Sequence, residues 1–404
     1  MSALVDRVRT RLAEDGREPT PAAVADAVRA ESGGVASDLD VLAALRVLRE
    51  ELVGAGPLDP LLRDPRTTDV LVSGGGTVLV DRGAGLEVAP VRLPDEPAVR
   101  RLAQRLALAA GRRLDDASPY VDGWLAGGPG GPGGPGASGA ARGVRLHAVL
   151  APVAVDGTCL SLRVLRPAAH DLASLTRLGT LEPTAEQLLR AVVAARLAVL
   201  VSGGTGSGKT TLLAALLGAV DPAERILTVE DAQELQPRHP QVVRLVARPA
   251  NIEGVGGVSL RDLLRQALRM RPDRVVVGEV RGGEVCDLLS ALNTGHDGGA
   301  GTVHANSVRE VPARLEALAA LGGMERAALH SQLAAAVQVV LHMRRTPPGR
   351  VLEAVGVLGR RAAAGSAEVV VRPVWERGRG WTADRDHLGR LLAERGVPAP
   401  WGAS

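Results

Sequence analysis

The run LAVLVSGGTGSGKTTLLAALLGAV, from Leu197 to Val220, carries the strongest structural signal in this 404-residue sequence. An apolar stretch predicted as a buried strand leads into a glycine-rich turn, and a helix-forming stretch leads out. Within the turn, Gly203-x4-Gly208-Lys209-Thr210 matches the Walker A pattern in full. Glycines let backbone N–H groups approach phosphate oxygens, and the helix N-terminus adds the positive end of its dipole. The run therefore predicts a loop that binds ATP and Mg²⁺, made of Gly203, Gly204, Thr205, Gly206, Ser207, Gly208, Lys209, Thr210 and Thr211.

Lys209 is the only lysine in the chain, because the other 47 of the 48 lysine and arginine residues are arginine. A slender ammonium fits a narrow phosphate loop, whereas a planar guanidinium is wider. We expect Lys209 to bridge the β- and γ-phosphates, and the Thr210 hydroxyl to hold Mg²⁺.

Two further runs place carboxylates after predicted strands. RVVVGEVRG contains Glu279 in the manner of a Walker B element, and RILTVEDAQEL contains Glu230 and Asp231, with Glu234 one turn on. Carboxylates at the carboxyl ends of parallel strands lie at the ligand edge of a sheet. We expect Glu279 to hold Mg²⁺ or its waters and Glu230 to orient the attacking water. Each could also be an ordinary surface acid after a strand.

The alternation of apolar patterns predicts an α/β fold. Residues 1–55 read as a helical segment, 56–167 as a small α/β domain, 168–183 as a linker and 184–404 as the nucleotide-binding domain. In the last part, helices and strands alternate, which predicts a mainly parallel sheet covered by helices. The run GGPGGPGGPGASG, residues 127–139, has no large apolar residue and reads as an inert surface insertion.

Composition excludes several classes of protein. Phe is absent and Tyr occurs once, so stacking platforms for single-stranded nucleic acid are not expected, although the sequence pI is about 9.4. The two cysteines, Cys159 and Cys286, are far apart, which argues against a disulfide framework or a zinc cluster. The first 14 residues carry acidic and basic charges, so we do not expect them to be a signal peptide, and the most apolar stretch, 188–201, contains two arginines. We expect a cytoplasmic protein that reaches the membrane through partners.

Four blocks in order resemble the secretion ATPases of the type II/type IV superfamily, in particular the tight-adherence (Flp-type) pilus assembly ATPases and their conjugation relatives. The blocks are GGTGSGKTT, TVEDAQEL, LRMRPDRVVVGEVRG and NTGHDGGAGTVHAN, the last of which contains His296 and His304. From chemistry alone, either histidine could sense a phosphate or could be a satisfied polar residue at a strand end. The resemblance extends from about residue 58 to about residue 357.

The resemblance implies a RecA-like domain, a homohexameric ring and inner-membrane platform proteins as partners. By position, Glu230 corresponds to the catalytic glutamate, Glu279 to the Walker B acid and His304 to the histidine near the γ-phosphate. Arg145 and Arg163 match arginines that the family's N-terminal domain directs at the nucleotide. The run at 127–139 departs from the family, and no four-cysteine zinc module is present, which favours the pilus or conjugation branch.

Three functions remain open from the sequence. The leading interpretation is a mechanochemical ATPase for pilus assembly or secretion. A conjugation-type ATPase or nucleic-acid translocase on the same core is the first alternative, and a scaffold that binds ATP without turnover is the second. The presence of both Glu230 and Glu279 argues against the scaffold.

Overall fold

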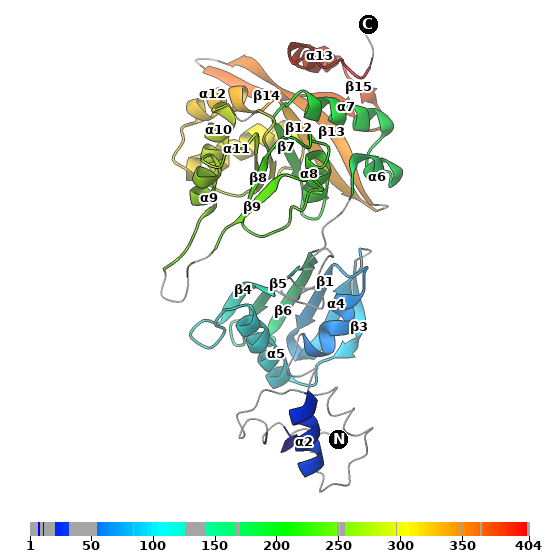
Figure 1. Ribbon diagram of the computed structural model, residues 1–404, viewed down its shortest axis with the longest axis vertical. Coiled ribbons are helices and arrows are strands. Elements are labelled where there is room, and N and C mark those ends of the chain that lie inside the picture. The colour runs from blue at the N-terminus through cyan, green and yellow to red at the C-terminus, as the bar shows by residue number, and fades with distance from the viewer. Residues whose placement is uncertain are drawn as a thin grey trace. The chain divides into compact units, whose positions relative to one another are not determined.

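The chain divides into two compact units, Met1–Arg166 and Pro167–Ser404. The structure, a computed structural model, describes residues 7–8, 11, 21–31, 55–83, 85–125, 143–165, 170–248, 250, 255–295, 297–347, 349–363 and 366–401 (Figure 1). The glycine- and proline-rich run at 127–139 lies outside these residues, as does most of the expected helical segment at 1–55. Within that segment the described helix is α2, Pro21–Glu31.

The first unit is built on one antiparallel sheet with the strand order β3-β2-β1-β6-β5-β4. Its core gathers apolar side chains from alternate strand positions and from the amphipathic helix α5, which Asp95 caps by accepting a hydrogen bond from the N–H of Ala98. The elements of this unit after α2 are η1 Gly56–Leu58, α4 Asp59–Arg63, β1 Asp69–Ser73, η2 Gly74–Gly76, β2 Thr77–Asp81, β3 Leu86–Arg92, α5 Glu96–Ala109, β4 Tyr120–Leu125, β5 Gly143–Val149 and β6 Cys159–Leu165.

The second unit holds a nine-stranded sheet with the order β15-β14-β13-β12-β7-β11-β10-β8-β9. The six strands from β12 to β9 in that order are parallel to their neighbours, and β13, β14 and β15 are added antiparallel. The strands are β7 Val199–Gly203, β8 Ile226–Glu230, β9 Val242–Val246, β10 Arg274–Val280, β11 Ala300–Val303, β12 Val339–Thr346, β13 Gly349–Ala363, β14 Ser366–Glu376 and β15 Gly380–Trp381.

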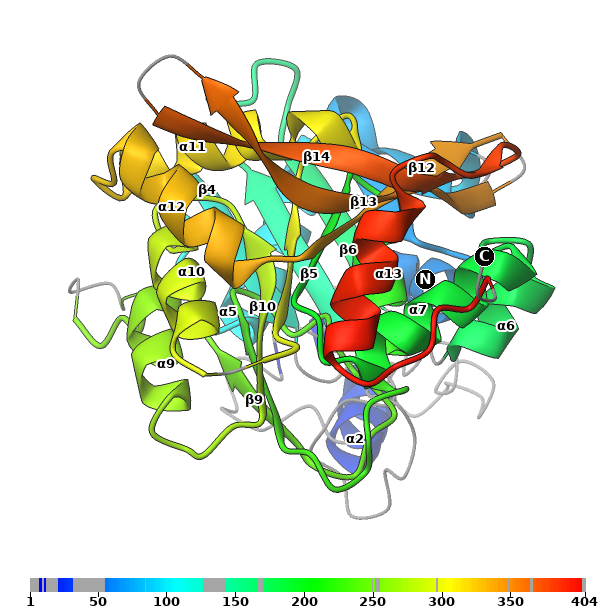
Figure 2. The ribbon, with the colours of Figure 1, turned by 90° about the horizontal axis from the view of Figure 1, so that it is seen from above.

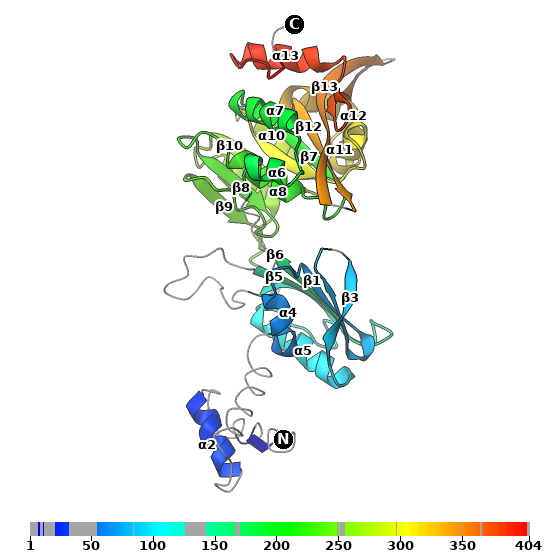
Figure 3. The same ribbon diagram turned by 90° about the vertical axis from the view of Figure 1, so that its right-hand side faces the viewer.

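Helices cover both faces of this sheet (Figure 3). Along β7, Val199 and Val201 join the core under α6, α7, α8 and α13, whereas Leu200 joins the core under α9 to α12. The long β13–β14 hairpin runs along one side of the unit with α13 against it (Figure 2). The helices are α6 Leu172–Arg177, α7 Pro183–Ala194, α8 Lys209–Leu217, α9 Leu260–Ala267, α10 Val285–Asn293, η3 Val308–Glu310, α11 Val311–Leu321, α12 Arg326–Ala336 and α13 Arg385–Glu394.

The α/β class predicted from the sequence is confirmed. The segment at 168–183, however, does not have the character of a linker. It contains helix α6, and Leu172, Leu175 and Leu181 are buried in the core of the second unit. The run is short and has a Gly-Thr break, which favours a connection, yet its leucines recur every third residue. The helix that contains the first of them packs against α7, which follows directly, and against α8.

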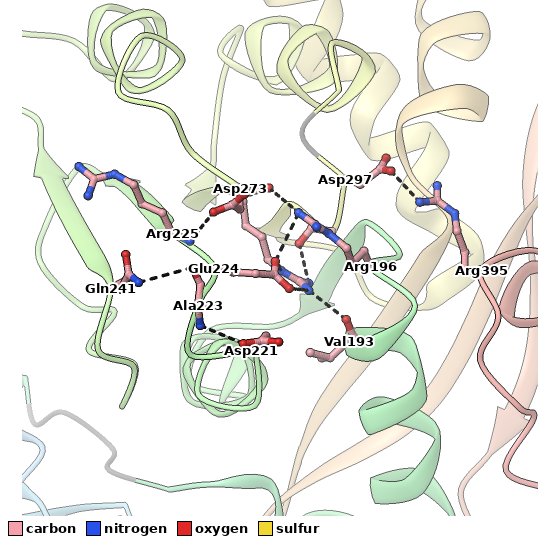
Figure 4. A network of polar contacts seen from close by, with 12 residues as sticks. Val193, Arg196, Asp221, Ala223, Glu224, Arg225, Gln241, Asp273, Asp297 and Arg395 are labelled. Atoms are coloured by element: carbon pink, nitrogen blue, oxygen red, sulfur yellow. Dashed lines mark hydrogen bonds and ion pairs between the residues drawn. The ribbon is translucent and has the colours of Figure 1, made fainter.

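A buried ion pair secures the end of the second sheet where β8 and β10 begin. Arg274, which is 3% exposed, donates from Nε and Nη2 to Glu224 over 2.7 and 3.1 Å, and from Nη2 to the carbonyl of Val193 over 3.0 Å. Arg196 lies 3.4 Å from the same carboxylate, and Asp273 accepts from the backbone N–H of Arg225 over 2.7 Å (Figure 4). The network connects the end of α7 to the starts of β8 and β10. It therefore fixes the amino-terminal ends of these two strands.

Candidate active site

The glycine-rich loop follows β7 directly and ends in α8. Gly203 has φ +148°, and a Cβ there would lie 2.3 Å from the carbonyl oxygen of Met343. Gly206 and Gly208 adopt left-handed φ values of +68° and +95°, which side chains rarely tolerate. The Ser207 hydroxyl donates to the carbonyl of Gly204 over 2.9 Å and so braces the loop from within. Three of the four glycines in the loop are therefore required by the backbone path, and such a path suits a phosphate cradle.

The Lys209 ammonium lies inside this loop. Its Nζ donates to the carbonyls of Gly203 and Gly204 over 3.1 and 3.0 Å, and it lies 3.4 Å from Nε2 of His304. Burial lowers the pKa of Lys209, an effect that the nearby carboxylates of Glu279 and Glu234 partly oppose. The position expected for a charge facing phosphate oxygens is thus occupied by the chain's single lysine.

Glu279 and His304 come from neighbouring strands, β10 and β11. Nε2 of His304 lies 2.5 Å from Oε1 of Glu279, and Arg281 pairs with the other oxygen of that carboxylate. Burial alone would raise the pKa of Glu279, but the hydrogen bond and charge of Arg281, with His304 and Lys209, outweigh it and hold that pKa below its usual value. Burial and the charge of Lys209 lower the pKa of His304. At neutral pH the cluster therefore holds an ionised carboxylate beside a neutral imidazole.

Glu230 and Glu234 take different positions although they belong to one run of sequence. Glu230, at the end of β8, is 3% exposed, and its Oε1 accepts from the backbone N–H groups of Glu234 and Leu235 over 3.1 and 2.9 Å. Its Oε2 is buried and has no hydrogen-bond partner among the residues that the structure describes, and burial raises the pKa of Glu230 to about 7. Glu234 instead accepts from the Thr210 hydroxyl over 3.3 Å. Glu230 thus positions the turn after β8, and this turn presents Glu234 to the phosphate loop.

The structure therefore brings Lys209, Thr210, Glu279 and His304 together, as expected, and adds Glu234. From the sequence alone, Glu234 is not expected to contact the phosphate loop. Glu234 lies four residues after Glu230 in TVEDAQEL, and this proximity is the signal that the sequence offers. Which of the two acids reaches Thr210 depends on how β8 packs. His296 lies outside the described residues.

Arg145 and Arg163 belong to the first unit. They are direct neighbours across β5 and β6, on the face of the sheet opposite the side chains that enter the core. Arg145 pairs with Asp122 over 2.7 Å and Arg163 with Asp69 over 2.9 Å. The arginines therefore form one cationic pair, held by two acids, on the face of the sheet that points away from the core of the first unit.

A separate cluster of Glu316, His330 and Glu368 offers three ligand atoms within 4.8 Å of one another. The backbone N–H of Val369 donates to Nδ1 of His330 over 3.0 Å, so the neutral ring carries its proton on Nε2, which faces Glu316 over 3.0 Å. Arg326 already bridges Glu316 and Glu368 over 2.9 and 2.8 Å. This arrangement is a satisfied ionic cluster rather than a metal site.

The donor set of the loop fits a nucleotide with Mg²⁺. The loop offers backbone N–H groups and the Lys209 ammonium, which suit phosphate oxygens, and the Thr210 hydroxyl with the Glu234 and Glu279 carboxylates supplies the oxygen ligands that Mg²⁺ prefers. Among the described residues, no helix is long and apolar enough to cross a bilayer.

Comparison with known proteins identifies the family. The model of the type II/IV secretion system protein family matches residues 51–350. The chain belongs to this family. Among curated secretion-family relatives, a Mycobacterium tuberculosis (strain H37Rv) protein that bears the name "putative conjugal transfer protein" is 63% identical over 359 residues, covering 89% of this chain and 98% of the relative. The conjugal transfer protein TrbB of Rhizobium radiobacter is 28% identical over 305 residues, covering 74% of this chain and 86% of the relative.

Solved structures agree at the level of fold. The crystal structure of the Legionella pneumophila ATPase DotB has a TM-score of 0.50 and 20% identity, covering 72% of this secretion-family chain and 76% of DotB. At this identity the similarity supports the fold alone.

The raised pKa of Glu230 predicts a pH-dependent stability. Because the folded protein binds this proton more tightly than the unfolded chain does, the free energy of unfolding falls as pH rises from the ordinary value of 4.5 to about 7 and then stays level. Glu230→Gln removes this loss, so we expect the variant to gain roughly 2 to 3 kcal/mol over the parent between pH 4 and pH 8. Urea unfolding across that range measures the difference, and Glu394→Gln, an exposed acid, is the control. An equal difference at both pH values would contradict the buried, protonated carboxyl.

Proposed function

We propose that this protein is a Mg²⁺-dependent P-loop ATPase that hydrolyses ATP to ADP and phosphate and thereby drives a secretion or pilus machine. The observation that carries the proposal is the Lys209 ammonium inside the glycine loop, with Thr210, Glu234, Glu279 and His304 at the same edge of the sheet. The chain's membership in the type II/IV secretion system protein family supports the proposed role in a secretion or pilus machine.

The described residues divide the chemistry among them. The loop amides and Lys209 bind and orient the phosphates and neutralise charge as the terminal phosphoryl group leaves. Thr210 and Glu279 would hold Mg²⁺, which would supply further charge neutralisation at the phosphates when bound. Glu234, at the end of a turn that Glu230 fixes, would orient the attacking water. The neutral His304, which contacts Glu279 and Lys209, would respond to the presence of the γ-phosphate.

The wider assembly follows from the family resemblance. We propose a RecA-like second unit, a homohexameric ring, and a cytoplasmic location at the inner membrane, where platform proteins receive the motion. In this assembly Arg145 and Arg163 neutralise charge at the γ-phosphate of a closed site. The names of relatives also favour a second candidate, an ATPase of conjugal transfer on the same core. Stimulation of hydrolysis by long single-stranded DNA would favour that candidate.

Lys209→Ala tests the ATPase itself. Loss of the only ammonium facing the phosphates should reduce steady-state phosphate release at least about 100-fold, because phosphoryl transfer depends on electrostatic stabilisation. Lys209→Arg should also fail, since a guanidinium overfills the loop whose carbonyls Nζ contacts at 3.0 and 3.1 Å. A fully active arginine variant would show that Lys209 does not have this role.

Glu234→Gln and Glu230→Gln separate the two acids. We expect Glu234→Gln to bind ATP about as tightly as the parent and to hydrolyse it about 100-fold more slowly, because the charge that orients water is lost. Glu230→Gln should retain most of its turnover near pH 7, because the parent carboxyl is already about half protonated there and bonds to the turn after β8 rather than to the phosphate loop. Isothermal titration beside a turnover assay makes the comparison. If Glu230→Gln is the slower variant, Glu230 orients the attacking water, as expected from the sequence, and Glu234 does not.

Arg145→Ala and Arg163→Ala test the role of the first unit. Each should leave ATP affinity unchanged and reduce kcat about 10³-fold, since an arginine at the transferring phosphoryl group acts on the transition state. Arg92→Ala, on strand β3 of the same sheet, is the matched control and should keep full turnover. Equal kcat values for all three variants would remove both arginines from the mechanism.

A further inference from the structure

A second group of cations lies beside the phosphate loop, on the hairpin formed by β12 and β13. The Nε of Arg350 donates to the carbonyl of Gly206 over 2.9 Å, and its Cδ lies 3.2 Å from where a Cβ of Gly208 would be. Nη1 of Arg345 lies 3.7 Å from the corresponding point at Gly206. Both side chains therefore lie over the middle of the loop, although Arg350 is 144 residues from Gly206 in sequence.

The two arginines face each other across the hairpin. Arg345 and Arg350 are register partners in the antiparallel pair, and like charges at such positions destabilise a sheet. No acid among the described residues pairs with either of them. The neighbouring Arg344, by contrast, pairs with Glu353 over 2.9 Å. An uncompensated cationic pair against a ligand-binding loop indicates that a ligand completes it.

The sheet order indicates which part of the ligand this is. Strand β7, which carries the loop, has β11 and then β10 on one side, and these hold His304 and Glu279. On its other side it has β12 and then β13, which hold Arg345 and Arg350. A triphosphate whose terminal phosphate lies toward His304 and Glu279 directs its nucleoside toward the hairpin.

The composition of the second unit gives the hairpin a chemical role. Phe and Tyr are absent from residues 167–404, so a purine there has no such ring to stack on. Trp375 is completely buried, and Trp381 and Trp401 pack on each other with ring centroids 4.5 Å apart. A guanidinium is planar and stacks on aromatic faces, so it replaces the missing ring.

We propose that Arg345 is the platform on which the purine base of the nucleotide stacks, and that Arg350 positions the loop beneath it through the Gly206 carbonyl. This inference rests on the proposed function and extends it to the nucleoside end of the site. Stacking depends on a flat face and not on the γ-phosphate, so Arg345 contributes equally to ADP and ATP binding and discriminates weakly between purines.

Arg345→Ala, Arg345→Lys and Arg344→Ala test the platform in the full-length chain. Isothermal titration with Mg²⁺ measures two ligands, ADP and inorganic tripolyphosphate, which has phosphates but no nucleoside. We expect Arg345→Ala to weaken ADP binding about tenfold and to leave tripolyphosphate binding unchanged, as befits a cation–aromatic contact. Arg345→Lys, which keeps the charge and loses the plane, should resemble the alanine variant. Arg344→Ala, the matched control, should bind both ligands as the parent does.

Three outcomes would overturn the proposal. Equal weakening of tripolyphosphate by Arg345→Ala would make this arginine a phosphate ligand, and full rescue by Arg345→Lys would make it a simple charge. Unchanged ADP binding in Arg345→Ala would exclude any contact with the nucleotide. Each of these leaves the proposed ATPase intact, whereas a parent chain that binds neither ligand overturns both proposals. Thermal melting of each variant, followed by circular dichroism, confirms that exposed Arg345 is replaced without unfolding.

Discussion

The pairing of β7 with β11 on one side and β12 on the other is the constraint on which the site depends. These parallel ladders place Ser202 opposite Val303 and His342, so three strand ends meet around the phosphate loop. The acids and His304 enter from the β10–β11 side, and the arginine hairpin enters from the β12–β13 side. A shift in either register would move one of these groups away from the loop while leaving the loop itself intact.

Burial then divides roles between side chains that look alike in sequence. Glu230 and Glu234 are four residues apart, yet one lies under the sheet edge with a raised pKa and the other reaches Thr210. Gly278 permits this arrangement, because a Cβ at that position would lie 2.7 Å from Cγ of Glu230. The glycine before the Walker B acid thus makes room for a carboxyl that supports the neighbouring turn.

The sequence predicts the parts of the site that are local and misses those that depend on distant packing. The loop from Gly203 to Thr211 is contiguous, so its place between β7 and α8 is predicted from the sequence, and the backbone geometry explains its glycines. Glu279 and His304 follow apolar strands, and the edge rule for parallel sheets places them correctly. Glu234 and Arg345 carry no comparable signal, because their roles depend on which strands pack together.

One further consequence follows from the solitary lysine. The side chain of Lys209 lies inside the loop, and burial lowers its pKa. At a given pH, a larger fraction of this side chain is therefore the neutral, nucleophilic amine than in an exposed lysine. A reagent that is small enough to enter the loop and that joins a group to lysine side chains therefore finds a single acceptor in the chain, and that acceptor is in the middle of the candidate nucleotide site. Covalent modification of lysine amines would therefore block the phosphate loop of this protein and would not label its surface.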